Sequence, residues 1–204
     1  MMTWTALIPL KGSGERKTRL AGRLNEAQRR ALSHELFQHV ASVLNRSSEL
    51  SEVMILSDVR PDDWGGPLIF DEGRGLNAEL QALTSTFRSR RLLVIHADLP
   101  LVSTEDIATL LAGAEDGCAI APDRRDSGTN AIALRDAAGF RFCFGPDSFM
   151  CHHDASQGRA CVLRRLGLGL DIETSGDLEA AVALGVALKP SERHHGLGHR
   201  RSVA

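Results

Sequence analysis

The stretch Leu93-Val-Ile-His-Ala-Asp-Leu-Pro100 decides how the rest of the chain is interpreted. The apolar residues from Leu92 to Ile95 are typical of a buried strand, and Pro100 prevents that strand from continuing. Asp98 lies between the strand and the proline. Ligands of α/β proteins bind outside the carboxyl ends of the strands, so this spacing places Asp98 where a ligand or a metal ion would bind.

The composition is that of an ordinary globular protein, with 43% hydrophobic and 25% charged residues among 204. This length fits one domain with a substantial core. A net charge of −2 gives no reason to expect a nucleic acid or an anionic membrane as partner. No apolar run approaches the ~20 residues of a membrane span, and no secretion signal is recognised, so a cytoplasmic protein is expected.

Apolar strands and amphipathic helices alternate along the chain, which predicts a mostly parallel sheet with helices on both faces. Strands are expected at residues 5–10, 53–57, 67–70, 91–97, 118–121, 131–134 and 168–172. Helices are expected at about 26–44, 75–88, 104–113 and 175–184, with a further helix that begins near Asp154 or Ser156 and runs to Leu166. Residues 1–189 would form one domain and the polar, His-rich residues 190–204 a flexible tail.

Capping residues mark three of these helices. Asn25 precedes the first one, and Ser103 with Asp106 three residues later resembles a capping box. Thr174 or Ser175 is expected to cap the last helix. The four cysteines show no Cys-x-x-Cys spacing, so we expect free thiols, three of them packed as small apolar groups, and no zinc site.

The loop after the first strand carries Lys11 and Lys17, with glycines at positions 12 and 14. Such glycines let backbone amides approach a ligand, and the lysines can neutralise phosphate oxygens. The loop is not a P-loop, because Gly-x-x-x-x-Gly-Lys-Ser/Thr is absent. A solvated basic turn is an equally good interpretation of its composition alone.

Asp171 is the expected partner of Asp98, because it stands at the end of the last expected strand. Two carboxylates from different strand ends can hold Mg²⁺ while water and phosphate take most of its other positions. The alternative is that Asp171 or Glu173 only caps the helix that follows.

Two turn-forming segments, 126–130 and 144–148, offer hydroxyls and amides that suit a small phosphorylated or carboxylated ligand. Asn77, at the start of a helix, either caps that helix or hydrogen-bonds a base. His152 and His153 either help to bind an anion or have a surface or capping role.

Several short motifs occur in one order and together resemble a known family. They are Lys11 followed by Lys17-Thr-Arg-Leu-Ala, Gly75-Leu-Asn77, Ala97-Asp-Leu-Pro100, Gly128-Thr129, Phe144-Gly-Pro-Asp-Ser148 and Asp171-x-x-Thr174. This pattern resembles the guanylyltransferases of coenzyme F-420 biosynthesis, which act on 2-phospho-L-lactate or phosphoenolpyruvate. The resemblance covers about residues 5–188. The chain departs from the pattern at Asn130, at Glu173 and in the segment 149–154.

The resemblance implies a single-domain nucleotidyltransferase fold of the GT-A type, a Rossmann-like three-layer sandwich. It also implies transfer of GMP from GTP to the phosphate of a three-carbon phospho-acid, with release of pyrophosphate. The acceptor would be 2-phospho-L-lactate, phosphoenolpyruvate or 3-phospho-D-glycerate. The alternatives are a nucleotidyltransferase that acts on a sugar phosphate or a molybdenum pterin, and a non-catalytic nucleotide-binding regulatory module.

The resemblance assigns roles to residues at matching positions. Asp98 and Asp171 would bind Mg²⁺, and Lys17 would complete the catalytic group. Substrate contacts would come from Lys11, Arg19, Asn77, Thr129, Gly145 and Ser148, with Thr129, Gly145 and Ser148 on the acceptor. The partners would thus be GTP and a small phosphorylated carboxylic acid, and a homodimer is left open.

Overall fold

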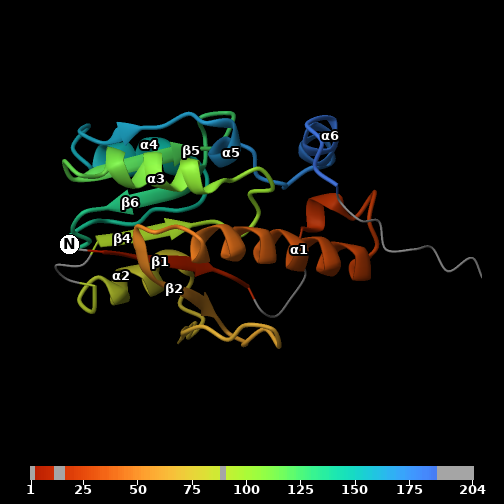
Figure 1. Ribbon diagram of the computed structural model, residues 1–204, viewed down its shortest axis with the longest axis horizontal. Helices are drawn as coiled ribbons and strands as arrows, with labels where there is room; N and C mark the ends of the chain where they lie inside the picture. The colour runs from red at the N-terminus through yellow and green to blue at the C-terminus, as the bar shows by residue number, and fades with distance from the viewer. Residues whose placement is uncertain (1–2, 12–16, 88–90, 188–204) are drawn as a thin grey trace, which may run out of the picture.

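A seven-stranded mixed sheet forms the centre of the computed structural model, which describes residues 3–11, 17–87 and 91–187 (Figure 1). Its strand order is β3-β2-β1-β4-β6-β5-β7. The strands are β1 Trp4–Pro9, β2 Leu50–Ser57, β3 Leu68–Phe70, β4 Arg91–Ile95, β5 Cys118–Pro122, β6 Thr129–Leu134 and β7 Cys161–Val162. The tail at 190–204 and the glycines of the first loop lie outside the described residues.

The pairing of the strands confirms the expected mostly parallel sheet. It also brings segments that are distant in sequence together at the ends of the central strands. β1 pairs in parallel with β2 and β4, whereas β6 runs antiparallel to both β4 and β5. The carboxyl end of β4 therefore meets the beginning of β6. Ile95 lies opposite Ala131, and the His96 N–H donates to the Asn130 carbonyl at 2.9 Å.

Helices cover both faces of the sheet and complete three layers. On one face α1, Glu26–Asn45, and α3, Thr104–Gly113, pack against the sheet through Phe37, Val40 and Ile107. On the other face α2, Leu76–Leu83, and α4, Ser148–Ala155, pack through Leu80 and Phe149. Alternate residues of β1 enter the two cores, with Ile8 in one and Leu7 in the other, because successive strand side chains point to opposite faces.

A third, smaller apolar cluster lies at the end of the molecule where α1 begins, beside α6, Ser175–Ala183 (Figure 1). Leu20 of the short 3₁₀ helix η1, Thr18–Leu20, packs there with Leu32 of α1. Leu170, Ile172 and Ala181 complete the cluster. It fixes the segment before α6, and with it the position of Asp171.

The predicted caps are confirmed for three helices. Asn25, Ser103 and Thr174 each accept a hydrogen bond from the backbone N–H three residues later. The helix expected at 75–88 is shorter, because α2 ends at Leu83.

The predicted helix from Asp154 or Ser156 to Leu166 is wrong. The helix in this region is α4, which ends at Ala155, and Gln157 and Gly158 then adopt positive φ angles that no α-helix allows. β7 follows and pairs with β5.

The predicted strand 168–172 is also wrong. The short helix α5, Leu166–Gly169, and an irregular segment take its place. Periodicity cannot distinguish a helix from a strand over an apolar run of about four residues.

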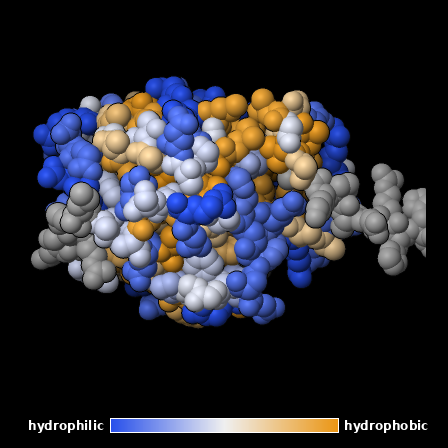
Figure 2. All heavy atoms as spheres, viewed as in Figure 1, coloured by the Kyte–Doolittle hydropathy of each residue, from blue (hydrophilic) through white to orange (hydrophobic). Residues whose placement is uncertain are grey.

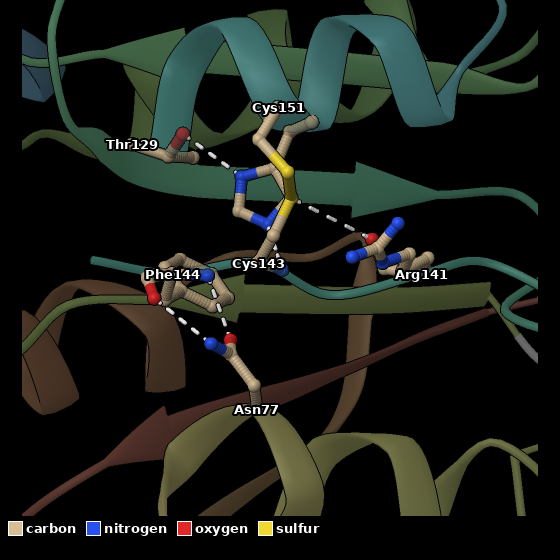
Figure 3. Close-up of a disulfide and its surroundings, with 7 residues drawn as sticks. Asn77, Thr129, Arg141, Cys143, Phe144 and Cys151 are labelled. Atoms are coloured by element: carbon tan, nitrogen blue, oxygen red, sulfur yellow. Dashed lines mark hydrogen bonds between the residues drawn. A yellow bond between two sulfur atoms is a disulfide. The ribbon is translucent and has the colours of Figure 1, made fainter. Parts of the chain in front are cut away.

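The cysteine prediction is wrong for two residues and confirmed for two. Cys143 and Cys151 form a disulfide, with Cα atoms 6.2 Å apart (Figure 3). Cys118 and Cys161 are free thiols, but Cys118 is only half-buried and Cys161 is exposed. The spacing of eight residues gave no sign of the pair, because the contact depends on the loop 144–147 folding back onto α4.

The surface shown in Figure 2 is mixed, with apolar groups gathered toward the upper right, where α6 lies in Figure 1. Large apolar side chains are exposed at Val182 in α6, at Leu184 just after it and at Leu166 in α5. In the described part of the chain no helix is long and apolar enough to cross a membrane. The homodimer stays a prediction.

Candidate active site

Asp98 lies in the turn after β4, where the sequence placed it. Its Oδ2 is 3.1 Å from the Lys17 Nζ, and the Lys17 side chain is only 10% exposed. The same ammonium also donates to the backbone carbonyl of Ile172. Lys17 thus joins the loop after β1 to the Asp98 turn and to the segment before α6.

The second oxygen of Asp98 differs from the first. Oδ1 is buried and makes no hydrogen bond with any of the described residues. An unpaired carboxylate oxygen away from water costs free energy, so an orphaned atom of this kind suggests a ligand.

Asp171 lies near Asp98, although it does not follow a strand. The Ile172 N–H donates to the Asp98 backbone carbonyl at 3.1 Å, which fixes the two segments side by side. Burial, and then the negative charge of Asp98, raise the pKa of the Asp171 carboxyl to about 6. The two predicted metal ligands therefore meet and repel each other when both are ionised.

Asn130 positions the segment that carries Asp171, a role that the sequence did not suggest. Its side chain is buried, and its Nδ2 donates to the Leu168 carbonyl at 2.9 Å and to the Gly169 carbonyl at 3.3 Å. Asn130, one of the residues at which the chain departs from the family pattern, thus ties β6 to α5. Nothing in the local sequence could have revealed these partners, which lie 38 and 39 positions away along the chain.

The other predicted cations are placed differently. Arg19 lies in η1 and forms an ion pair with Glu173 at 2.7 Å, with both side chains well exposed. Arg19 therefore lies beside the segment that carries Asp171. Lys11 is exposed just beyond β1.

The two turn-forming segments lie side by side where the second one ends. The Phe149 N–H donates to the Ser127 carbonyl at 3.2 Å. Thr129 begins β6 and Ser148 begins α4, and both are buried. Gly145 has a φ of +130°, a backbone conformation that side-chain-bearing residues rarely adopt, so the turn requires glycine there.

Asn77 does not cap α2, because the N-cap position is Gly75 and no side chain bonds there. Its carboxamide instead binds both backbone groups of Phe144 (Figure 3). The Nδ2 donates to the Phe144 carbonyl at 2.9 Å, and the Oδ1 accepts from the Phe144 N–H at 2.7 Å. Asn77 therefore holds the 144–148 turn from α2.

His152 is completely buried, so a surface role for it is wrong. Its Nδ1 is 2.9 Å from the Thr129 Oγ1, and its Nε2 accepts the Cys143 N–H at 2.9 Å. Burial, and then the neighbouring His96, lower the pKa of His152 to about 4. The paired histidines in the sequence drew attention to this position but did not reveal its contacts.

The carboxylates of Asp98 and Asp171 fit a divalent cation that takes its other ligands from substrate and water. No group of three or more His, Cys, Asp or Glu side chains within the described ranges could hold a metal ion alone. The orphaned Asp98 Oδ1 and the raised pKa of Asp171 show a site that gains from a positive charge. Mg²⁺ typically binds through one or two carboxylates plus phosphates.

Comparison with solved structures identifies the fold. The chain matches a nucleotide-diphospho-sugar transferase of Desulfovibrio desulfuricans with a TM-score of 0.70 at 19% identity, over 88% of this chain and 86% of the other. It matches the 4-diphosphocytidyl-2C-methyl-D-erythritol synthase of Anaerococcus prevotii with a TM-score of 0.57 at 15% identity, over 90% and 96%. The predicted nucleotidyltransferase fold is confirmed.

Comparison with sequences identifies the family. The phosphoenolpyruvate guanylyltransferase of Sphaerobacter thermophilus is 36% identical over 87% of this chain and 92% of its own length. The enzyme of the same name from Rubrobacter xylanophilus is 34% identical over 90% and 96%. The family model described as "Guanylyl transferase CofC like" matches residues 4–196. The chain therefore belongs to this guanylyl transferase family and is a nucleotidyltransferase.

Proposed function

We propose that this protein transfers the GMP group of GTP to the phosphate of phosphoenolpyruvate, releasing pyrophosphate, in coenzyme F-420 biosynthesis. The proposal rests on one observation: Lys17, Asp98 and Asp171 lie close together beyond the carboxyl ends of the central strands β1 and β4. Phosphoenolpyruvate is the first of the three candidate acceptors because the relatives from Sphaerobacter and Rubrobacter bear its name.

The reaction needs no covalent intermediate on the protein. An oxygen of the acceptor phosphate attacks the α-phosphorus of GTP and forms a new P–O bond. The bond to the β-phosphate breaks, and its electron pair leaves with pyrophosphate. Because such a transfer joins two anions, the protein contributes mainly positioning and neutralisation of charge.

Each residue of the site has a proposed part in that task. Asp98 and Asp171 would hold Mg²⁺, which when bound would offset the negative charge of the phosphates. Lys17 balances Asp98 and contributes a buried positive charge beside the reacting phosphates. Lys11 and Arg19 attract the triphosphate from exposed positions.

Acceptor contacts are proposed for the turn that Asn77 holds. Gly145 offers an open backbone. Apart from its chain neighbours, no heavy atom of the described residues lies within 4 Å of the position that a Cβ atom would take there. Thr129 and Ser148 supply hydroxyls beside it. Hydroxyls and backbone amides suit the carboxylate and phosphate of a small phospho-acid.

The test is pyrophosphate release by the purified protein with GTP and Mg²⁺, with each phospho-acid supplied in turn. We expect turnover with phosphoenolpyruvate. Turnover only with 2-phospho-L-lactate or 3-phospho-D-glycerate would change the acceptor but not the reaction. Absence of turnover with all three would overturn the proposal.

The variant Asp98→Asn tests the metal site. It removes an anionic ligand with little change in shape, so turnover should fall well over tenfold. Asp116→Asn is the matched control, because Asp116 is exposed in the turn before β5, at the opposite edge of the sheet. Near-normal turnover of Asp98→Asn would remove Asp98 from the site.

A further inference from the structure

The hydrogen bonds of His152 determine which ring nitrogen carries the proton. The Cys143 backbone N–H can only donate, and it points at Nε2 from 2.9 Å. Nε2 must therefore offer its lone pair, and a neutral imidazole then carries its proton on Nδ1. The lowered pKa of His152 agrees with a neutral ring.

This tautomer sets the direction of the next hydrogen bond. Nδ1–H donates to the Thr129 Oγ1 at 2.9 Å, so the threonine oxygen acts as an acceptor in that contact. The hydroxyl proton of Thr129 must then point elsewhere. Thr129 is 1% exposed, and no described residue other than His152 is bonded to its hydroxyl. A buried hydroxyl proton without a partner favours an incoming acceptor oxygen.

An aromatic ring and a disulfide next to His152 hold this arrangement in place. The Phe144 ring packs edge-on against the imidazole with centroids 4.7 Å apart, and Asn77 fixes the Phe144 backbone. The disulfide from Cys143 to Cys151 holds the donating amide next to α4 (Figure 3). The ring therefore has little freedom to rotate or to exchange its two partners.

We propose that His152 is a positioning residue that directs the Thr129 hydroxyl proton toward an anionic oxygen of the bound phospho-acid. This inference rests on the proposed function, because it takes Thr129 as an acceptor contact. It adds a specific polarity to that contact: the threonine donates. A carboxylate or phosphate oxygen only accepts hydrogen bonds when ionised, so the polarity matches the class of substrate.

The first test needs no turnover. The ¹⁵N chemical shifts of the His152 ring in the free protein report which nitrogen is protonated, and His152→Gln identifies the signals. We expect a protonated Nδ1 and an unprotonated Nε2. A ring protonated on Nε2 would overturn the inference even if the enzyme proves to be a guanylyltransferase.

Kinetics test the coupling between the two residues. Thr129→Val removes the hydroxyl, and His152→Gln can still accept from Cys143 but cannot reach Thr129. Each should raise the KM for the acceptor about tenfold and leave the KM for GTP unchanged, as expected for one hydrogen bond to a charged group. Thr129→Ser and His152→Asn, which keep the hydroxyl and a donor near the Nδ1 position, should stay within about threefold of the wild type.

The double variant decides between positioning and a structural role. If His152 acts through the Thr129 hydroxyl, His152→Gln should have no further effect on the acceptor KM in the Thr129→Val background. Equal effects in both backgrounds would overturn the inference. Failure of the proposed function would look different, because the wild type itself would then show no turnover.

Discussion

Two carboxylates and one ammonium group share a half-buried space in this protein. Asp98 is paired with Lys17, whereas burial and the negative charge of Asp98 dominate the surroundings of Asp171. Its carboxyl has a raised pKa because ionisation occurs out of water and beside Asp98. The two carboxylates therefore repel each other when both are ionised, and a positive charge beside them would relieve this conflict.

A stability measurement can test this conflict at Asp171. Folding raises the pKa of the Asp171 carboxyl from 3.8 to about 6. The protonated carboxyl therefore stabilises the folded state at pH values below 3.8, and this stabilisation is lost as the pH rises through about 6. At pH 8 the ionised side chain therefore opposes folding. Asp171→Asn should raise the free energy of unfolding at pH 8 without metal, by on the order of 2 kcal/mol, while turnover is lost.

Urea unfolding of both proteins at pH 8 and pH 4, with a chelator present, checks this prediction. The difference should be largest at pH 8 and nearly absent at pH 4. A destabilised Asp171→Asn at pH 8 would mean that the carboxylate makes a favourable contact in the folded protein.

The sequence drew attention to the charged residues that meet, Asp98 and Lys17, but not to the residues that hold them. Asp98 and Lys17 could be found because a charged residue after an apolar strand is informative by itself. Asn130 and His152 act through partners that are distant in sequence or belong to the backbone. Such contacts leave no local pattern, so they became visible only in the structure.

Among the elements, strands β1, β4 and β6 were predictable because several apolar residues in succession identify a central strand. The region from α4 to α5 was not predictable, because its elements are short and no proline marks the end of α4 at Ala155. The structure nevertheless brings Asp171 close to Asp98, as expected. The reason given, a strand end, was wrong, and the backbone bond from Ile172 to Asp98 takes its place.

The disulfide links α4 to the segment before it and gives a prediction at this scale. A bond that closes a loop of this length should stabilise the folded protein by roughly 2–3 kcal/mol in the chain-entropy model. The unfolding midpoint in urea should therefore fall on reduction. The protein should show two reactive thiols when denatured without reductant and four after reduction.

Two variants control this experiment. Cys143→Ser should remove the effect of the reductant on the midpoint, whereas Cys161→Ser, which replaces a free and exposed thiol, should preserve it. Four reactive thiols in the untreated denatured protein would contradict the assigned bond.

At the scale of the whole molecule, the site is assembled from segments far apart in the chain. Lys17 follows β1, Asp98 follows β4, and Asp171 precedes α6. Lys17 contacts Asp98 and Ile172, which lie 81 and 155 positions further along the chain. An unfolded chain cannot keep these groups together, so a ligand that needs all of them binds only the folded protein.

Ligand binding should therefore stabilise the whole fold by mass action. At a concentration of 100 times Kd, a ligand adds about 2.7 kcal/mol to the free energy of unfolding. We expect Mg²⁺ with GTP to raise the Tm of the wild type and of Asp116→Asn. Asp98→Asn should show a much smaller rise, since its site lacks one anionic ligand. An equal rise in the Tm of Asp98→Asn would mean that the metal–nucleotide complex binds elsewhere, because a ligand stabilises the fold only through the folded groups that it contacts.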